Sequence, residues 1–186
     1  MKKNKKNGNL SIGIVMVIFI SSVILGISSV RVKRQNDKKN LNISKTLIYE
    51  IYKKYATLAF DQNKEYNIIF DYDLKQIEIL DASKKIIEKI ELPKTIEYAT
   101  VYGDKVLKRI ENKITINGNI TPIYSIYIFG KDKVAKYRVS LYGFDTLKYL
   151  RINLYKNIND KKATYKDIVN FHSKFSTELD KSWVKE

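Results

Sequence analysis

The chain has 186 residues, with 35 Lys or Arg against 20 Asp or Glu, and its formal net charge at pH 7 is +15. Hydrophobic residues make up 44% of the chain, which is enough for a folded core and excludes wholesale disorder. The absence of Cys excludes disulfides and thiolate chemistry, and a single His argues against a His-based metal site or catalytic triad.

The positive charge is concentrated near the N-terminus. Residues 1–39 hold nine Lys or Arg and one Asp, a net of +8, which leaves +7 for the other 147 residues. A basic excess by itself indicates a nucleic acid or an anionic membrane as partner. Here half of it flanks an apolar segment, where basic residues meet lipid headgroups, so the charge favours a membrane-inserted chain.

The apolar segment is the strongest signal in the sequence. Residues 10–30 (LSIGIVMVIFISSVILGISSV) carry no charge over 21 positions, close to the ~20 residues that cross a bilayer core. A cleaved signal peptide usually has a shorter apolar region of about 7 to 15 residues. After a basic leader over residues 1–8, we therefore expect a transmembrane or assembly helix over 9–30, contacting lipid or other helices through Leu10, Ile14, Val17, Ile18, Ile24 and Leu25.

Residues 31–60 continue the helical pattern without Pro or Gly. Apolar residues recur there at helical spacing, at Leu47, Ile48, Ile51, Tyr52, Tyr55, Leu58 and Ala59. The sequence therefore predicts one continuous helix from about residue 10 to 60, whose amphipathic half (31–60) covers a sheet.

Short β-rich runs fill residues 61–158. They fall at 66–71, 75–80, 85–92, 95–102, 113–117, 123–129, 134–142 and 146–156, separated by turn residues. This spacing favours an antiparallel meander of about six to eight strands. In the last hairpin, one face carries apolar core candidates: Tyr137, Val139, Leu141, Leu150, Ile152 and Leu154.

A helix is expected in the C-terminal region, 159–186. Thr164 can cap it with Asp167 in a capping box, and an apolar stripe extends to Trp183. His172 lies in this stripe and is interpreted as a structural residue. The chain shows no constellation for an enzyme, and we expect no cofactor and no metal site.

One candidate binding surface lies on the other face of the last hairpin. Lys136, Arg138, Tyr149 and Arg151 combine positive charge with an aromatic ring, the combination that binds single-stranded nucleic acid or another anionic ligand. A solvated sheet face is the alternative reading of the same residues.

The order of these features resembles a type IV pilin or pseudopilin: a short basic leader ending in Gly8, an apolar helix with an amphipathic second half, then an antiparallel sheet. Three phrases resemble the H-type minor pseudopilins of type II secretion and the minor pilins of competence (DNA-uptake) machines. They are ATLAFDQNKEYNIIFD (56–71), Leu92-Pro93 before a strand, and the glycine of the late hairpin, Gly143. The resemblance covers about residues 2–156 and implies an α+β, pilin-like fold.

The resemblance also implies cleavage by a prepilin peptidase after Gly8, which leaves Asn9 as the first residue. Members of the family usually carry glutamate at the fifth mature position, where this chain has Gly13. Cleavage after Gly13 instead would place Ile14 and Ile18 at the first and fifth positions. In the family this carboxylate neutralises a neighbouring subunit's N-terminal amine. Its absence resembles tip subunits that initiate a filament; alternatively, the peptidase does not process this chain.

Three functions are therefore weighed. The first is a structural, non-enzymatic minor pilin-like subunit, with its N-terminus cytoplasmic and its domain outside the cell membrane, serving in a type II secretion or DNA-uptake filament. Its partners would be lipid, other pilin-like subunits and prepilin peptidase. The second is a permanently anchored single-pass protein whose external domain binds a ligand or partner. The third is nucleic-acid binding through the basic sheet surface.

Overall fold

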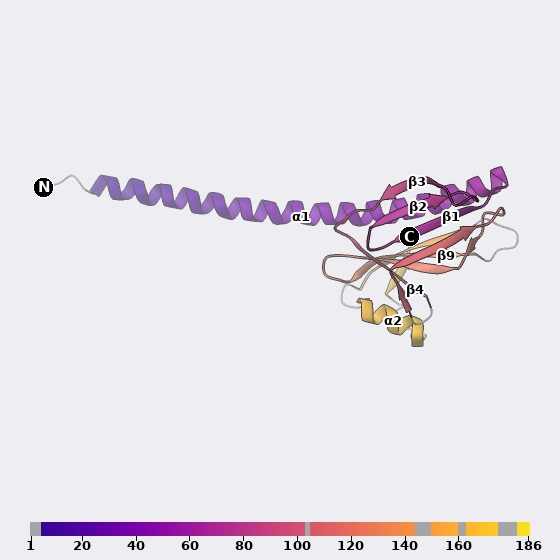
Figure 1. The fold of residues 1–186 in the computed structure, drawn as a ribbon. Coiled ribbons are helices and arrows are strands. Elements are labelled where there is room, and N and C mark those ends of the chain that lie inside the picture. The colour runs from indigo at the N-terminus through magenta and orange to yellow at the C-terminus, as the bar shows by residue number, and fades with distance from the viewer. Residues whose placement is uncertain (1–4, 103–104, 144–149, 160–162, 175–181) are drawn as a thin grey trace. The chain divides into compact units, whose positions relative to one another are not determined.

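The computed structural model describes residues 5–102, 105–143, 150–159, 163–174 and 182–186 (Figure 1). Within the two helices, the surroundings of side chains are described for residues 14–62 and 165–170. The chain divides into two compact units, residues 1–38 and 39–186, and each is described by itself.

Helix α1 (Lys5–Gln62) contains the apolar segment and the amphipathic half without a break. The expectation of one continuous helix over about residues 10–60 is therefore confirmed. The helix ends at Asn63, which has a positive φ of 51°, and the Lys64 N–H donates to the Ala59 carbonyl at 3.1 Å. Asn adopts this left-handed conformation more readily than most residues, so it ends the helix just before the first strand.

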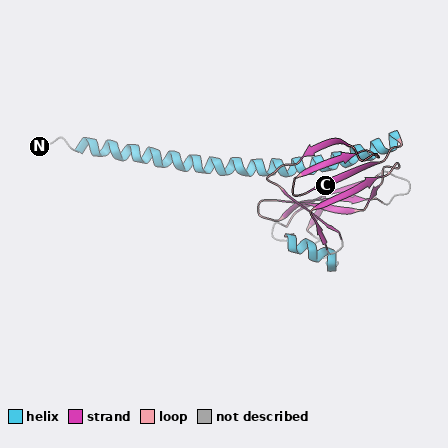
Figure 2. Cartoon of the chain, in the orientation of Figure 1, coloured by secondary structure: helices cyan, strands magenta, loops and turns pink. Residues whose placement is uncertain are grey.

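Two antiparallel sheets form the body of the second unit (Figure 2). The first has the order β3-β2-β1-β6-β7, and the second has the order β11-β10-β9-β8-β4-β5. The strands are β1 (Tyr66–Asp71), β2 (Gln76–Leu80), β3 (Ile86–Glu91), β4 (Glu97–Tyr102), β5 (Lys105–Leu107), β6 (Arg109–Ile114), β7 (Ile120–Thr121), β8 (Tyr124–Phe129), β9 (Ala135–Tyr142), β10 (Arg151–Asn157) and β11 (Trp183–Lys185).

The expected fold class, a long N-terminal helix packed on antiparallel β-structure with a second helix near the C-terminus, is confirmed. The expectation of a single meandering sheet is wrong. Strand β6 returns to pair with β1, and β8 pairs with β4, so consecutive hairpins are divided between two sheets. Strand β5 was not expected, and β6 occupies Arg109–Ile114 instead of 113–117.

The main hydrophobic core joins the second half of α1 to both sheets. The helix contributes the predicted stripe, including Ile48 and Tyr52, which are fully buried. Alternate residues of the first sheet meet them, such as Ile68 and Phe70, and Val139 meets them from the second sheet. The predicted core face of the β9–β10 hairpin lies in this core, with Leu141 and Leu150 buried and Tyr137, Ile152 and Leu154 partly buried.

A second core covers the opposite face of the second sheet. Buried sheet residues such as Tyr127 and Phe129 meet Ile168 of α2 (Tyr165–Lys174) and Trp183 of β11. The second sheet therefore has apolar packing on both faces, whereas the sequence predicted a sheet with one face exposed to solvent.

The C-terminal region differs in part from its prediction. The capping box is confirmed, because the Asp167 N–H donates to Thr164 Oγ1 at 3.4 Å and the Thr164 N–H donates to Asp167 Oδ2 at 2.9 Å. The helix, however, is described only to Lys174, and Trp183 belongs to a strand that pairs with β10. The side chain of His172 and residues Phe175 and Leu179 lie outside the described residues.

Gly143, which was singled out in the late hairpin, has a clear packing reason. A Cβ at this position would lie 2.4 Å from the backbone carbonyl oxygen of Ile120. Only glycine lets the end of β9 pass this close to β7.

Candidate functional site

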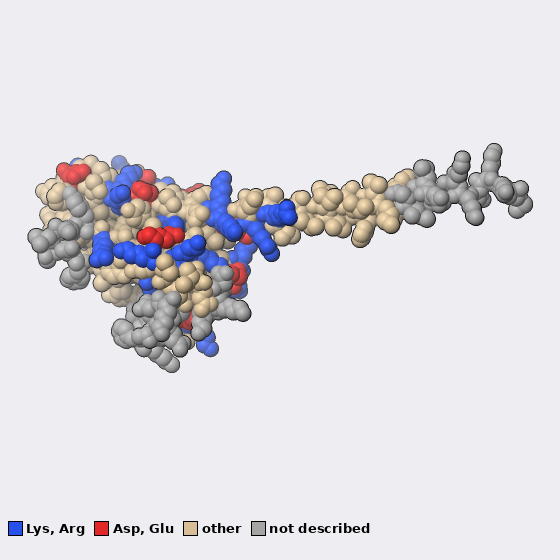
Figure 3. Space-filling view, turned by 180° about the vertical axis from the view of Figure 1, so that it is seen from behind, with Lys and Arg blue, Asp and Glu red and all other residues tan. Residues whose placement is uncertain are grey.

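The apolar part of α1 is the first candidate site. One helix of the described chain is long and apolar enough to cross a membrane, with a mean hydropathy of 2.2 in its most apolar stretch, none of which is buried. The predicted assembly side chains Ile14, Val17, Ile18, Ile24 and Leu25 are all more than half exposed. Figure 3 shows this stretch of helix free of charged side chains.

Polar groups of this stretch bond within the helix itself. The Ser22 hydroxyl donates to the Phe19 carbonyl at 2.7 Å, and the Ser29 hydroxyl donates to the Gly26 carbonyl at 2.8 Å. A hydroxyl that is bonded to its own helix can enter an apolar medium without losing a hydrogen bond. A Cβ at Gly26 would meet no atom within 4 Å, so the fold of this chain does not require a glycine there.

The predicted processing residues, Gly8 and Asn9, lie in the first turns of α1, and the side chains around them are outside the described part. The side chain of Leu10 is also outside it. Cleavage after Gly8 therefore stays a prediction.

The basic surface on the β9–β10 hairpin is not assembled as expected. Arg138 is buried at 8% exposure, and its guanidinium carbon lies 4.1 Å from the centre of the Tyr155 ring and 5.3 Å from that of Trp183. Arg151 is exposed, and Tyr149 lies outside the described residues. The expected exposure of Arg138 is wrong because the Tyr155 and Trp183 side chains, which belong to or pack against the second core, cover this face.

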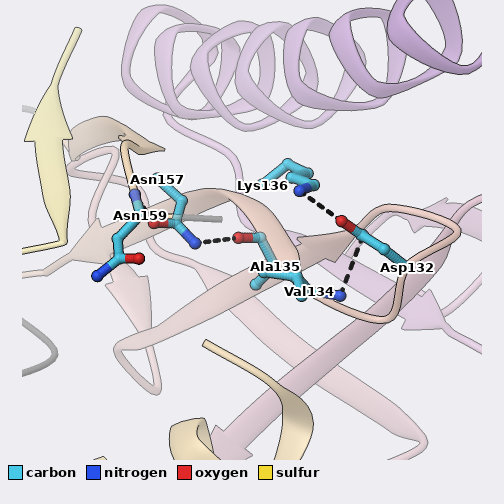
Figure 4. Close-up of polar contacts among 6 residues, drawn as sticks. All are labelled: Asp132, Val134, Ala135, Lys136, Asn157 and Asn159. Carbon is cyan, nitrogen blue, oxygen red and sulfur yellow. Dashed lines mark hydrogen bonds and ion pairs between the residues drawn. The ribbon is translucent and has the colours of Figure 1, made fainter. Parts of the chain in front are cut away.

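Lys136 is also engaged inside the domain. Its ammonium group is 2.6 Å from Asp132 Oδ2, in the turn between β8 and β9 (Figure 4). On the same strand, the Ala135 carbonyl accepts a hydrogen bond of 2.8 Å from the Asn157 side-chain amide of β10. The structure therefore does not bring Lys136, Arg138 and Arg151 together as one solvent-facing anion site.

A buried polar cluster was missed by the sequence reasoning. Asn112 on β6 accepts hydrogen bonds from the Tyr52 hydroxyl of α1 at 3.1 Å and from the Tyr124 hydroxyl of β8 at 2.5 Å. Burial raises the pKa of the Tyr52 and Tyr124 hydroxyls well above the usual value. The Ser44 hydroxyl of α1 and the Tyr98 hydroxyl of β4 also share a hydrogen bond of 2.7 Å. The Tyr52–Asn112 and Ser44–Tyr98 hydrogen bonds therefore both fix the second half of α1 to the sheets.

Glu186, the last residue of the sequence, also connects elements that are distant in the sequence. Its side chain pairs with Lys45 of α1, and its backbone N–H donates to the Leu154 carbonyl at 3.0 Å. These contacts hold the end of the chain against β10 and α1.

The surface of the domain has shallow depressions. One of about 650 Å³ lies by the end of α1 and the β2–β3 turn, lined by Lys64, Tyr66, Asp81 and Ile87 among others. Asp81 holds this turn by accepting hydrogen bonds from the Ser83 hydroxyl at 2.6 Å and from the backbone N–H groups of Ser83 and Lys85, both at 2.9 Å. The Ser83 hydroxyl, and then these N–H groups, lower the pKa of Asp81. Within the described residues, no group of three or more His, Asp or Glu side chains could hold a metal ion.

Comparisons with known proteins give likenesses in structure only. No protein-family model matches the chain, and no curated protein matches it. The chain is similar to a solved structure of the minor pseudopilin EpsH from the Type 2 Secretion System of Vibrio cholerae, at 15% identity and a TM-score of 0.46, covering 61% of this chain and 95% of that one. A crystal structure of the same pseudopilin is similar at 17% identity and a TM-score of 0.48, with 62% and 94% covered.

Proposed function

We propose that the chain is a non-enzymatic, minor pilin-like subunit of a filament in a type II secretion or DNA-uptake machine. The observation that carries this proposal is α1, whose apolar first part is exposed all around while its second part is built into the domain core. A helix with an exposed apolar surface needs either lipid or other helices around it. A filament subunit uses both in turn, first as a membrane anchor and then as a packed helix.

The proposed topology places the N-terminus in the cytoplasm and the domain outside. During assembly, residues 10–30 would exchange lipid contacts for packing against the helices of other subunits. The domain, whose core is closed by its own second half of α1, would keep its structure through this exchange. It would then present the surface that is specific to its machine.

We further propose that the subunit initiates a filament rather than repeating along it. If Gly8 is the cleaved residue, Gly13 stands where the family carries glutamate. Residues 1–36 contain no acidic residue at all. Without a carboxylate there, this chain cannot neutralise the N-terminal amine of a neighbour inside an apolar filament core. A subunit at the tip has no need to supply that charge to a preceding neighbour.

The test is the mass of the mature N-terminus after co-expression with a prepilin peptidase. A chain beginning at Asn9 supports the proposal, and one beginning at Ile14 moves the cleavage to Gly13 while keeping a processed subunit. A Gly8→Val variant is the matched control and should block cleavage at the first site. An intact Met1 in the presence of active peptidase would overturn the proposal.

The second candidate is a permanently anchored protein whose external domain binds a ligand or partner. The missing glutamate and the depression near Tyr66 favour it. It predicts an uncleaved chain that stays in the membrane fraction whether or not the machine is present, so the same experiment separates the two.

A further inference from the structure

The stretch of α1 that follows the apolar segment carries five closely spaced cations, and the first four of them, Arg31, Lys33, Arg34 and Lys38, fall within the first compact unit. All four side chains are exposed. None of the ion pairs formed among the described residues involves them. Asp37 is the only acidic residue before Glu50, so positive charge dominates this stretch, which we call the basic collar.

The helix distributes these charges around its axis. Spacings of three and seven residues place Arg31, Arg34 and Lys38 on one face, and Lys33 points to the other side. The collar covers seven steps of the helix, about 10 Å along its axis. The headgroup layer of one leaflet is of similar depth, about 5–8 Å, and begins where the apolar segment ends.

We propose that the basic collar binds the phosphate groups of anionic phospholipids in the leaflet on the domain side of the membrane. This inference rests on the membrane insertion in the proposed function and on no later step of filament assembly. Lys and Arg next to a span are attracted to an anionic bilayer surface, and the attraction falls off within a Debye length. The collar meets this condition because Arg31 directly follows Val30, the last residue of the uncharged segment.

Two features favour lipid over a nucleic acid at this site. The collar is about two helical turns long and directly follows the membrane-spanning segment. Lipid headgroups are therefore the anions closest to it at all times. It also has no aromatic side chain between Arg31 and Lys38 on which a base could stack.

The experiment uses the full chain reconstituted into vesicles of phosphatidylcholine and phosphatidylglycerol in equal amounts. The protein is extracted in a mild nonionic detergent, and the lipids that remain bound are quantified by native mass spectrometry. We expect phosphatidylglycerol to be enriched about five-fold among the retained lipids. The enrichment should decline as salt is raised during extraction.

Three variants make the test specific. The quadruple variant R31Q/K33Q/R34Q/K38Q should return the retained lipid to the composition of the vesicle. The charge-preserving variant R31K/R34K should keep the enrichment. The matched control K84Q/K85Q/K94Q/K105Q removes four exposed cations from the domain instead, and it should keep the enrichment too.

The proposal is overturned if the collar variant still enriches phosphatidylglycerol or if the domain control loses the enrichment equally. Retained nucleic acid in place of lipid would also overturn it. The domain's thermal melting is followed in parallel and should be unchanged in all variants. Lipid enrichment does not depend on peptidase cleavage, so this result and the N-terminal mass can fail separately.

Discussion

The two halves of α1 share one secondary structure and have opposite environments. In the first half, Leu25 is 69% exposed and apolar residues surround the helix, while in the second half Ile48 and Tyr52 are fully buried along one stripe. A stripe can be satisfied by the sheets of the same chain, whereas an all-round apolar surface cannot. The second half is therefore stabilised by its own domain, whereas under the proposed function the first half needs lipid or other helices around it.

A matched pair of substitutions tests this difference with the largest expected effect. Ile48→Asp buries a carboxylate without a partner, at a cost of several kcal/mol against a typical total stability of about 5–15 kcal/mol. We expect the domain to lose its cooperative thermal transition, measured by circular dichroism of the full chain in detergent. Ile18→Asp should leave that transition unchanged.

In the membrane the pair should behave in the reverse way. Asp near the centre of a span costs about 3 kcal/mol on insertion, so Ile18→Asp should lower the membrane-integrated fraction in an alkaline-wash assay. If Ile18→Asp lowered the melting temperature as Ile48→Asp does, the first half would belong to the folded core and the comparison would be wrong.

Ionisation of tyrosines at alkaline pH should destabilise only the second half of α1 and its domain, because the first tyrosine of the chain is Tyr49. Burial raises the pKa of Tyr98 to about 12, against a weaker opposite effect of its hydrogen bond with Ser44. Burial likewise raises the pKa of Tyr52, Tyr72 and Tyr124. The unfolded chain loses these protons from about pH 10 and the folded domain does not, so stability is intact below pH 10 and falls as pH rises.

We therefore expect the domain to unfold between about pH 10 and 12 while the apolar half keeps its helix in detergent. Tyrosinate absorbance reports the first event and residual helical circular dichroism reports the second. Tyr102→Phe is the control, since Tyr102 is 53% exposed and its loss should not move the transition. Complete tyrosine ionisation in a still folded domain would contradict the prediction.

A smaller effect is expected from the polar cluster that joins the second half of α1 to both sheets. Asn112→Ala removes the acceptor of the Tyr52 and Tyr124 hydroxyls. Because these two hydroxyls also bond to each other, one buried donor is left without a partner, and the free energy of unfolding should fall by about 2–3 kcal/mol. Tyr52→Phe removes one donor and leaves Tyr124 bonded, at about 1 kcal/mol. Urea denaturation of the full chain in detergent measures both. Equal losses in the two variants would show that Asn112 contributes only packing.

Local patterns predicted much of this architecture. The continuous helix, its buried stripe and the hairpin of β1 and β2 follow from apolar periodicity and turn residues, which are properties of neighbouring positions. The division into two sheets could not be predicted in this way, because β6 returns to β1 across some forty residues. Such pairings depend on which sheet edges and apolar faces remain exposed once the local hairpins have formed, and the pattern of a single sequence does not contain that information.

The candidate basic surface shows the same limit. Alternation in β9 correctly placed Arg138 on the face opposite Val139, but it did not reveal that Trp183 covers that face. Trp183 fits a helical period as well as it fits a strand, and only its pairing with Asn157 decides between them. The apolar segment and the basic collar needed no such information, since their signal is contiguous in the sequence.

The smallest effect is expected at Glu88 on β3, where the second half of α1 makes an ion pair that has no counterpart in the apolar half. The Lys54 ammonium at 2.6 Å, with a further hydrogen bond from Tyr55, lowers the pKa of this carboxyl. A lowered folded-state pKa contributes stability above the ordinary Glu value that is lost as pH falls through the lowered one. Glu88→Gln should therefore cost less than about 1 kcal/mol at neutral pH, because the pair is partly exposed, and nothing at acid pH. The control Glu91→Gln, in an exposed position of the same strand, should not change the free energy of unfolding at either pH. If Glu88→Gln lowered the free energy of unfolding equally at both pH values, packing rather than charge would hold β3 to the helix.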